Sequence, residues 1–220
     1  MSKLHAGTAA LILFLAAAAV SVAQAADDRV VNGCMIRPAT LCLQFDLQST
    51  DLHGAKLDDS DFSMSNLSAA NLGDADLARA VLHQTTLDNA RLESAVLDRA
   101  DLTQAKLVSA DLDRARLVEA NLHSAVLDGA RLEQAQLNGA NLSDAHLQNA
   151  RLDGAQLERA DLRGALLNNA SLRGANLTGV QFDNANLKGA DLTGATLADA
   201  TFVGARMQGC KGCPASSTTD

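Results

Sequence analysis

The chain carries one five-residue pattern of hydrophobic and polar positions across residues 45–209. Every fifth residue from Leu47 to Met207 is large and apolar, which gives 33 centres: 29 Leu, three Phe and one Met. The residue two positions before the centre is Ala in 27 of these 33 pentads. The other three positions are mostly polar or Gly. Each pentad therefore has two residues that can face inward, the Ala and the centre, and three that interrupt the apolar pattern.

A period of five fits neither a regular helix nor a flat strand. In a helix, five residues advance the apolar position by 140°, which scatters the centres around the axis. In a strand, Ala and the centre share a face, but the next Ala falls on the opposite one. Of the 15 Gly residues, 11 stand two positions after a centre, where a positive φ would be tolerated. The pattern thus predicts short extended segments that alternate with corners.

Phrases such as Ala100-Asp101-Leu102 and Ala140-Asn141-Leu142 are similar to the A(D/N)Lxx repeat of the pentapeptide-repeat proteins. The chain resembles this family over about three-quarters of its length. The resemblance implies an all-β fold: a right-handed, four-sided parallel β-helix of about eight coils with four pentads in each. In that register Phe62, Phe182 and Phe202 share one column. With ~4.8 Å between coils, the rod would be roughly 40 Å long.

Residues 1–25 have the features of a secretory signal peptide. Lys3 precedes an apolar core at Ala9–Val20, and Ala23-Gln24-Ala25 forms a small-residue cleavage signal. The apolar run is short for a membrane span, although an uncleaved anchor is the alternative. We expect an exported protein, periplasmic or secreted, without stable membrane insertion after cleavage.

The four cysteines lie outside the regular repeat, two on each side. Cys34 and Cys42 fall in residues 26–44, where an oxidising compartment favours a disulfide that closes a cap over the first coil. Phe45 would fill the core beneath it. Cys210 and Cys213 begin the tail, residues 210–220, and favour a small closing disulfide, with free or intermolecular thiols as the alternative. A redox role for this C-x-x-C is disfavoured because no helix is predicted beside it.

The first coils are acidic. Seven Asp residues between Asp46 and Asp76 are opposed only by Lys56. One interpretation is a surface for a basic partner, or a weak calcium site around Asp58, Asp59 and Asp61. The simpler one is that Asp or Asn before the centre belongs to the repeat and is solvated.

The middle of the chain holds two regularly charged columns, which together we call the charged stripe. One column precedes the centre and one follows it, on the same side of four successive coils. Either the stripe recognises a partner, or its charges neutralise each other in exposed pairs worth ~0–1 kcal/mol each. Its members are Arg91, Glu93, Asp111, Asp113, Arg131, Glu133, Arg151 and Asp153.

No enzymatic, cofactor or metal motif accompanies the repeat. The Gly residues recur by fives, so no phosphate-binding loop is formed, and His53, His83, His123 and His146 occupy variable polar positions. A core filled by Leu and Ala leaves no ligand pocket. There is no Trp or Tyr for stacking, and the 18 basic residues less Lys3 leave 17 against 26 acidic ones, a net charge of −9. That balance disfavours nucleic acid. We predict a non-enzyme without cofactor or metal.

Three functions remain open. The first is an exported scaffold whose sides bind a protein partner. The second is self-association, end to end or as a homodimer through the C-terminal coil near Phe202, Val203 and Met207. The third follows from the family resemblance alone: some members mimic duplex DNA and protect or inhibit topoisomerases, a role that export would disfavour.

Overall fold

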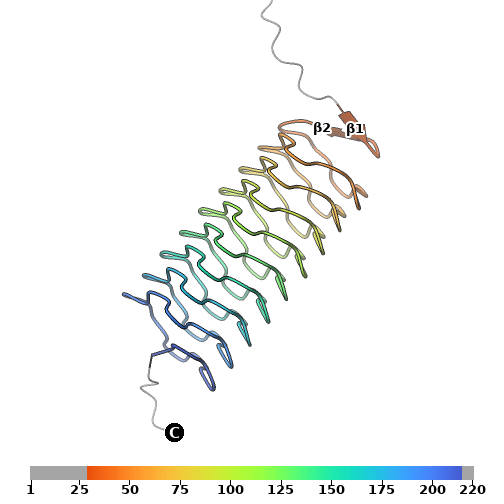
Figure 1. Ribbon diagram of the computed structural model, residues 1–220. Helices are drawn as coiled ribbons and strands as arrows, with labels where there is room; N and C mark the ends of the chain where they lie inside the picture. The colour runs from red at the N-terminus through yellow and green to blue at the C-terminus, as the bar shows by residue number, and fades with distance from the viewer. Residues whose placement is uncertain (1–28, 215–220) are drawn as a thin grey trace, which may run out of the picture.

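The computed structural model describes residues 29–214, which form a straight rod of stacked coils with one end covered by a small hairpin (Figure 1). The signal peptide expected at residues 1–25 and the last residues of the tail, 215–220, lie outside the described part of the chain. The two regular strands, β1 (Arg29–Val31) and β2 (Cys34–Ile36), pair antiparallel and make that hairpin. No helix in the described part is long and apolar enough to cross a membrane.

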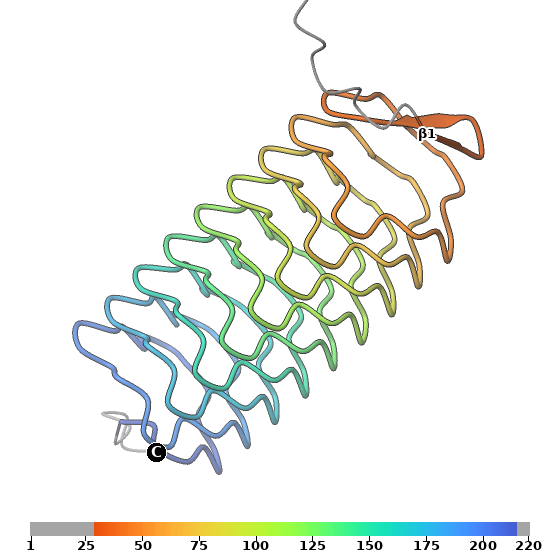
Figure 2. The same cartoon turned by 45° about the horizontal axis from the view of Figure 1, so that its top comes forward.

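The coils are joined by parallel single-residue bridges, each linking two residues 20 apart in sequence. The bridges recur every five residues, from Leu41↔Asp61 to Asp191↔Lys211, so each coil has four sides. This is the right-handed four-sided parallel β-helix that the repeat predicts. Figure 2 shows the coils stacked in register. We number the sides in chain order, with centres at Leu47, Leu52, Leu57 and Phe62 on sides one to four.

The core is a solid column of centres and alanines. From Leu47 to Leu192 every centre is 0–1 % exposed. The expected Phe column is confirmed on side four, where the Phe182 and Phe202 rings stack with their centroids 5.0 Å apart. Each coil contacts only its neighbours, so stability is close to a sum over adjacent coils.

The corners are β-turns. The amide two residues before a centre donates to the carbonyl of the preceding centre, as Ala70 does to Leu67 over 3.0 Å. All 33 residues that stand two after a centre have a positive φ, 11 of them Gly and 22 not. A positive φ at the third residue marks a type II turn. The spacing of the Gly residues thus predicted the position of the corners correctly. The coil imposes the same positive φ on residues such as Arg114 and Gln104, where this conformation costs roughly 1–2 kcal/mol.

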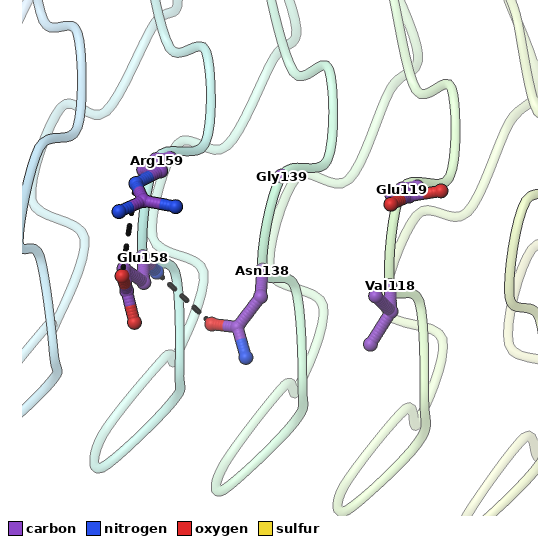
Figure 3. Close-up of a pocket in the computed structure, with 6 residues that line it drawn as sticks. All are labelled: Val118, Glu119, Asn138, Gly139, Glu158 and Arg159. Atoms are coloured by element: carbon purple, nitrogen blue, oxygen red, sulfur yellow. Dashed lines mark hydrogen bonds and ion pairs between the residues drawn. The ribbon is translucent and has the colours of Figure 1, made fainter.

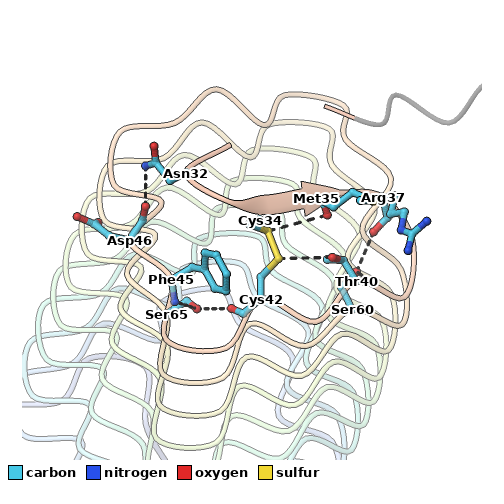
Figure 4. Close-up of a disulfide and its surroundings, with 10 residues drawn as sticks. All are labelled: Asn32, Cys34, Met35, Arg37, Thr40, Cys42, Phe45, Asp46, Ser60 and Ser65. Atoms are coloured by element: carbon cyan, nitrogen blue, oxygen red, sulfur yellow. Dashed lines mark hydrogen bonds between the residues drawn. A yellow bond between two sulfur atoms is a disulfide. The ribbon is translucent and has the colours of Figure 1, made fainter. Parts of the chain in front are cut away.

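The N-terminal end is closed by the hairpin and a disulfide (Figure 4). Cys34 of β2 is bonded to Cys42, with their Cα atoms 5.5 Å apart, and both residues are buried. Phe45 lies partly buried against the core below the hairpin. The first bridge starts at Leu41, because Cys42 takes the inward position that Leu takes in later pentads.

Polar residues that replace Ala near this end bond to backbone. Ser65 Oγ donates to the carbonyl of Cys42 and accepts from the amide of Phe45. Ser60 Oγ accepts from the amide of Thr40 and donates to the carbonyl of Arg37 over 3.3 Å. These buried hydroxyls therefore tie the loop after the hairpin to the first complete coil.

The C-terminal end is closed only in part. Cys210 and Cys213 form the second disulfide and pack against the core. Leu192 beside them is buried, whereas Leu197, Phe202 and Met207 of the last coil are half-buried. The end of the core is therefore accessible on three of its four sides within the described residues.

Candidate interaction surfaces

The outward Asp and Asn residues satisfy turn amides. In 14 pentads the Asp or Asn just before the centre accepts from the amide two residues later, as Asn141 does from Ser143 over 3.0 Å. In seven others an Asp or Asn one coil earlier accepts instead, as Asp128 does from Gln148. None of these seven pentads has its own Asp or Asn before the centre. Many surface carboxylates are therefore structural acceptors.

The charged stripe is brought together on side two. Arg91, Asp111, Arg131 and Arg151 are joined in one column by successive bridges. Ion pairs link this column to its neighbour: Arg91 Nε lies 3.4 Å from Glu93 Oε1, and Arg151 Nη2 lies 2.5 Å from Glu133 Oε1.

Three acids of the stripe also accept from turn amides. Asp111 Oδ1 accepts from the amide of Asp113 at 3.1 Å. Asp113, whose side chain is 13 % exposed, pairs with Arg131 and accepts from the amide of Glu133, and the pairing raises the pKa of Arg131. Asp153 accepts from the amide of Arg173 at 3.0 Å. The stripe is thus a network of mutually neutralised charges, which favours a structural role for them and leaves recognition of a partner by the stripe a hypothesis.

The acidic first coils are partly neutralised by one arginine. Arg79 donates to both carboxylate oxygens of Asp59, at 2.7 and 2.6 Å, and lies 3.8 Å from Asp58. These hydrogen bonds lower the pKa of Asp59. Asp61 accepts from Ser63. Arg79 thus lies where a cation would have to bind, and within residues 29–214 no three His, Cys, Asp or Glu side chains are grouped to hold a metal ion.

The histidines lie apart on the surface. His53 Nε2 is 3.8 Å from Asp74, and His123 Nδ1 is 2.9 Å from Ser143 Oγ. These contacts are polar surface contacts between coils.

Open depressions occur where a turn residue lacks a side chain. One of about 310 Å³ lies around Gly139 on side three, where three successive coils each contribute two residues (Figure 3). Its polar contacts are internal: Asn138 Oδ1 accepts from the amide of Glu158 at 3.0 Å, and Glu158 lies 3.7 Å from Arg159. Another, of about 420 Å³, lies around Gly73 and is bordered by His53, Arg91 and Glu93. The first has no Ser, Thr, Cys or His in its lining. The second is also lined by Ser94, but no hydrogen bond joins Ser94 to His53 in the described part of the chain.

The last coil exposes backbone as well as apolar side chains. In earlier coils the amide of each centre donates to a carbonyl in the next coil, as Leu187 does to Arg206 over 2.7 Å. Among the described residues the amides of Phe202 and Met207 have no such acceptor. Val203 beside them is 74 % exposed. Phe202, Val203 and Met207 indicated this coil as a candidate association surface from the sequence. That its backbone amides lack acceptors becomes evident only from the hydrogen bonds between coils.

Comparison with known proteins agrees with this geometry. The family model described as pentapeptide repeats matches in eight copies that together span residues 65–211. One similar solved structure is the crystal structure of HetL, which shares 32 % sequence identity with this chain. HetL is a pentapeptide repeat protein involved in heterocyst differentiation regulation, from the cyanobacterium Nostoc sp. strain PCC 7120. It matches with a TM-score of 0.60 over 79 % of this chain and 89 % of HetL.

A second solved structure shares the fold at lower identity. It is a trypsin-treated form of QnrB1, a plasmid-mediated fluoroquinolone resistance protein, and is 21 % identical with a TM-score of 0.64. The match covers 77 % of this chain and 90 % of QnrB1. A search of curated proteins gives no match. On the repeat, the 20-residue register and these likenesses, the chain belongs to the pentapeptide-repeat family.

Proposed function

We propose that the protein is an exported, non-enzymatic scaffold that binds a protein partner through the outside of its β-helix. The observation that carries this proposal is the solid core. Between Leu67 and Leu192 the centres, and the alanines two residues before them, are 0–1 % exposed, so only outward side chains can meet another molecule. Those side chains lie on flat sides and contact mainly one another. This arrangement suits contact with another macromolecule better than enclosure of a small substrate.

Export is supported by the cysteines. All four are paired, and stable disulfides are typical of proteins outside the reducing cytosol. The involvement of HetL in the regulation of heterocyst differentiation is compatible with protein binding. The likeness to QnrB1 extends to the fold alone, so the topoisomerase alternative gains no support from it.

The partner-binding side can be tested with a photo-crosslinking amino acid in the native host. Gln136, Asn141, His146 and Arg151 precede successive centres and sample the four sides of the middle coils, while Leu43 and Val203 sample the two ends. We expect one protein to be crosslinked reproducibly from one end or from one or two adjacent sides. No specific crosslink from any of the six positions would contradict a scaffold role.

Export needs a separate measurement. Mass spectrometry of the protein from each cell fraction should find a chain that starts near Ala26 outside the cytoplasm and gains four protons on reduction. A full-length cytoplasmic chain with four thiols would refute export.

Self-association through the C-terminal coil is the second candidate. It is favoured by the half-buried Leu197, Phe202 and Met207 and by the exposed Val203. The amides of Phe202 and Met207, which have no acceptor among residues 29–214, favour it as well. Sedimentation equilibrium should then show a mass that rises with concentration in the wild type but not in Val203→Glu. A monomer at all concentrations would exclude this mode.

A further inference from the structure

The large apolar side chains exposed on this rod gather at its capped end. Five of the seven in the described chain lie within the hairpin and the first coil; the other two are Val108, 36 % exposed, and Val203, 74 %. The five are Val30, 58 % exposed, Met35, 37 %, Leu41, 72 %, Leu43, 47 %, and Met64, 51 %. Clustered exposed apolar residues typically mark interaction sites, whereas scattered ones need no explanation.

Three of them are neighbours on side four, and we call Leu41, Leu43 and Met64 the cap patch. Leu41 and Leu43 flank the buried Cys42, and Leu41 bridges to the coil that carries Met64. Gln44 Nε2 lies 3.6 Å from the Met64 sulfur, which joins the two coils at the corner. Val30 and Met35 pair across the hairpin and extend the apolar surface over the end of the rod.

Folding gives no reason for these residue types. The outward positions of side four in later coils hold polar residues in most cases, such as Asp101, Asn121 and Thr103. Leu41 and Leu43 lie in the same columns as these residues and expose 72 % and 47 % of their surface. Binding to another molecule would explain them.

The border of the cap patch is negative. Asp61 bridges to Leu41, and Asp46 follows Leu43 around the corner. Neither carboxylate has a cationic partner among residues 29–214, whereas Asp59 nearby is held by Arg79. Arg37, which directly follows β2 and precedes Leu41 by four residues, is the one cation in the segment between the hairpin and Leu41 (Figure 4). Charge complementarity therefore favours a partner that is itself basic.

We propose that the cap patch docks an extended segment of a partner protein in which apolar side chains alternate with Lys or Arg. Leu41 and Leu43 are two residues apart on one outward surface, which matches the same-face spacing of an extended partner. This inference rests on the scaffold role proposed above and names the end of the scaffold and the chemistry of the segment.

The test uses defined peptides and the oxidised chain beginning at Ala26. An alternating Leu-Lys peptide should bind the wild type, and the triple variant Leu41→Ser, Leu43→Ser, Met64→Ser should weaken its Kd at least tenfold. The variant keeps the net charge, so attraction of any basic peptide to an acidic protein is unchanged. Val108→Ser changes an exposed apolar residue outside the cap patch; it is the control and should bind as the wild type does. Alternating Leu-Glu and Ser-Lys peptides should each bind at least tenfold more weakly.

Equal binding of Leu-Lys to the triple variant and the wild type would overturn the proposal, as would equal binding of Leu-Lys and Leu-Glu. A concentration-dependent mass that the triple variant abolishes would show that a second copy is the occupant. Binding that appears only when residues before Arg29 are removed would show that the chain covers its own patch. Crosslinks from the middle coils without any from Leu43 would reject this site and leave the scaffold role intact.

Discussion

At the scale of single residues, hydrogen bonding explains why Asp or Asn is preferred just before the centre. Its side-chain oxygen takes the place of a missing acceptor for a turn amide, either in its own pentad or one coil later. Asn141 illustrates the first form: it accepts from the amide and hydroxyl of Ser143 and donates to Asn121 at 3.1 Å. The preference for Asp and Asn in the repeat thus follows from the geometry of the corner.

Asn141→Ala should lower the free energy of unfolding by about 1 kcal/mol, because a turn amide and a cross-coil bond lose their partner. The matched control is Gln136→Ala, an outward position that bonds to other described residues through its backbone. Urea denaturation of both variants provides the comparison. If both variants lower the free energy of unfolding equally, the hydrogen bonds of Asn141 make no net contribution to stability.

Arg163→Gln tests a charged corner. Arg163 donates to Asp161 at 2.8 and 2.6 Å and so lowers the pKa of Asp161. A lowered folded-state pKa stabilises the fold above the unfolded pKa of about 3.9, and that contribution is lost as pH falls through the folded value. The variant should be less stable by up to ~1 kcal/mol at pH 7 and equal to wild type near pH 2. Arg37→Gln, without a carboxylate partner in residues 29–214, should show no such dependence. A pH-independent difference for Arg163→Gln would contradict the assignment.

At the scale of elements, the two ends differ in how they stop the ladder. The N-terminal end has a hairpin, a disulfide and buried Ser hydroxyls, whereas the C-terminal end has only a disulfide between cysteines three apart in sequence, which covers one side. The period of five predicted the coil and its inward residues, and the cysteine spacing predicted both pairs. The start of the ladder at Leu41 was not evident, since Cys replaces Leu in that pentad and two exposed leucines flank it. Cross-coil acceptors such as Asp113 were also hidden, because they depend on the 20-residue register.

Replacing Cys34 and Cys42 by Ser should destabilise the first coil by about 2.5 kcal/mol, the loop-entropy value for so short a closed segment. Hydrogen exchange should speed up at amides such as Leu47 and Leu52 and stay unchanged beyond the middle of the rod, because coils contact only their neighbours. In the double Ser variant of Cys210 and Cys213, exchange should speed up in the last coil and stay unchanged in the N-terminal half of the rod. Acceleration along the whole rod in either variant would exclude nearest-neighbour behaviour.

Gly212→Ala should loosen the C-terminal loop. An added Cβ would stand 2.7 Å from the Leu192 carbonyl, and Gly212 has φ +74°. Faster exchange of the Lys211 amide, which bonds to Ala190 at 2.9 Å, is the measurement. Gly54→Ala is the control, since it shares a positive φ (+63°) but has nothing within 4 Å of the added carbon. If Gly212→Ala leaves the exchange rate of the Lys211 amide as unchanged as Gly54→Ala does, the close approach of Gly212 to Leu192 does not determine the stability of the C-terminal loop.

At the scale of the whole molecule, the rod separates folding from recognition. The core uses the centres, which recur every five residues from Leu47 to Met207, and the residues two before them, which are Ala in 27 of the 33 pentads. The sequence therefore predicts which positions face inward. The surface uses the other positions, where the sequence showed the charged stripe but not which charges were already satisfied. Arg131 shows why: its partners Asp111 and Asp113 lie on the previous coil and become neighbours only through the bridges.

The register of 20 has a consequence for how such a chain can change in length. Loss of one pentad, for example residues 126–130, would leave every later Leu and Ala still facing inward. All downstream residues would nevertheless move by a quarter turn, and columns such as Arg131–Arg151 would pass to a different side. Loss of four pentads would shorten the rod and keep every column aligned. The interior therefore tolerates insertions and deletions in steps of five, whereas an evolved surface survives only steps of twenty.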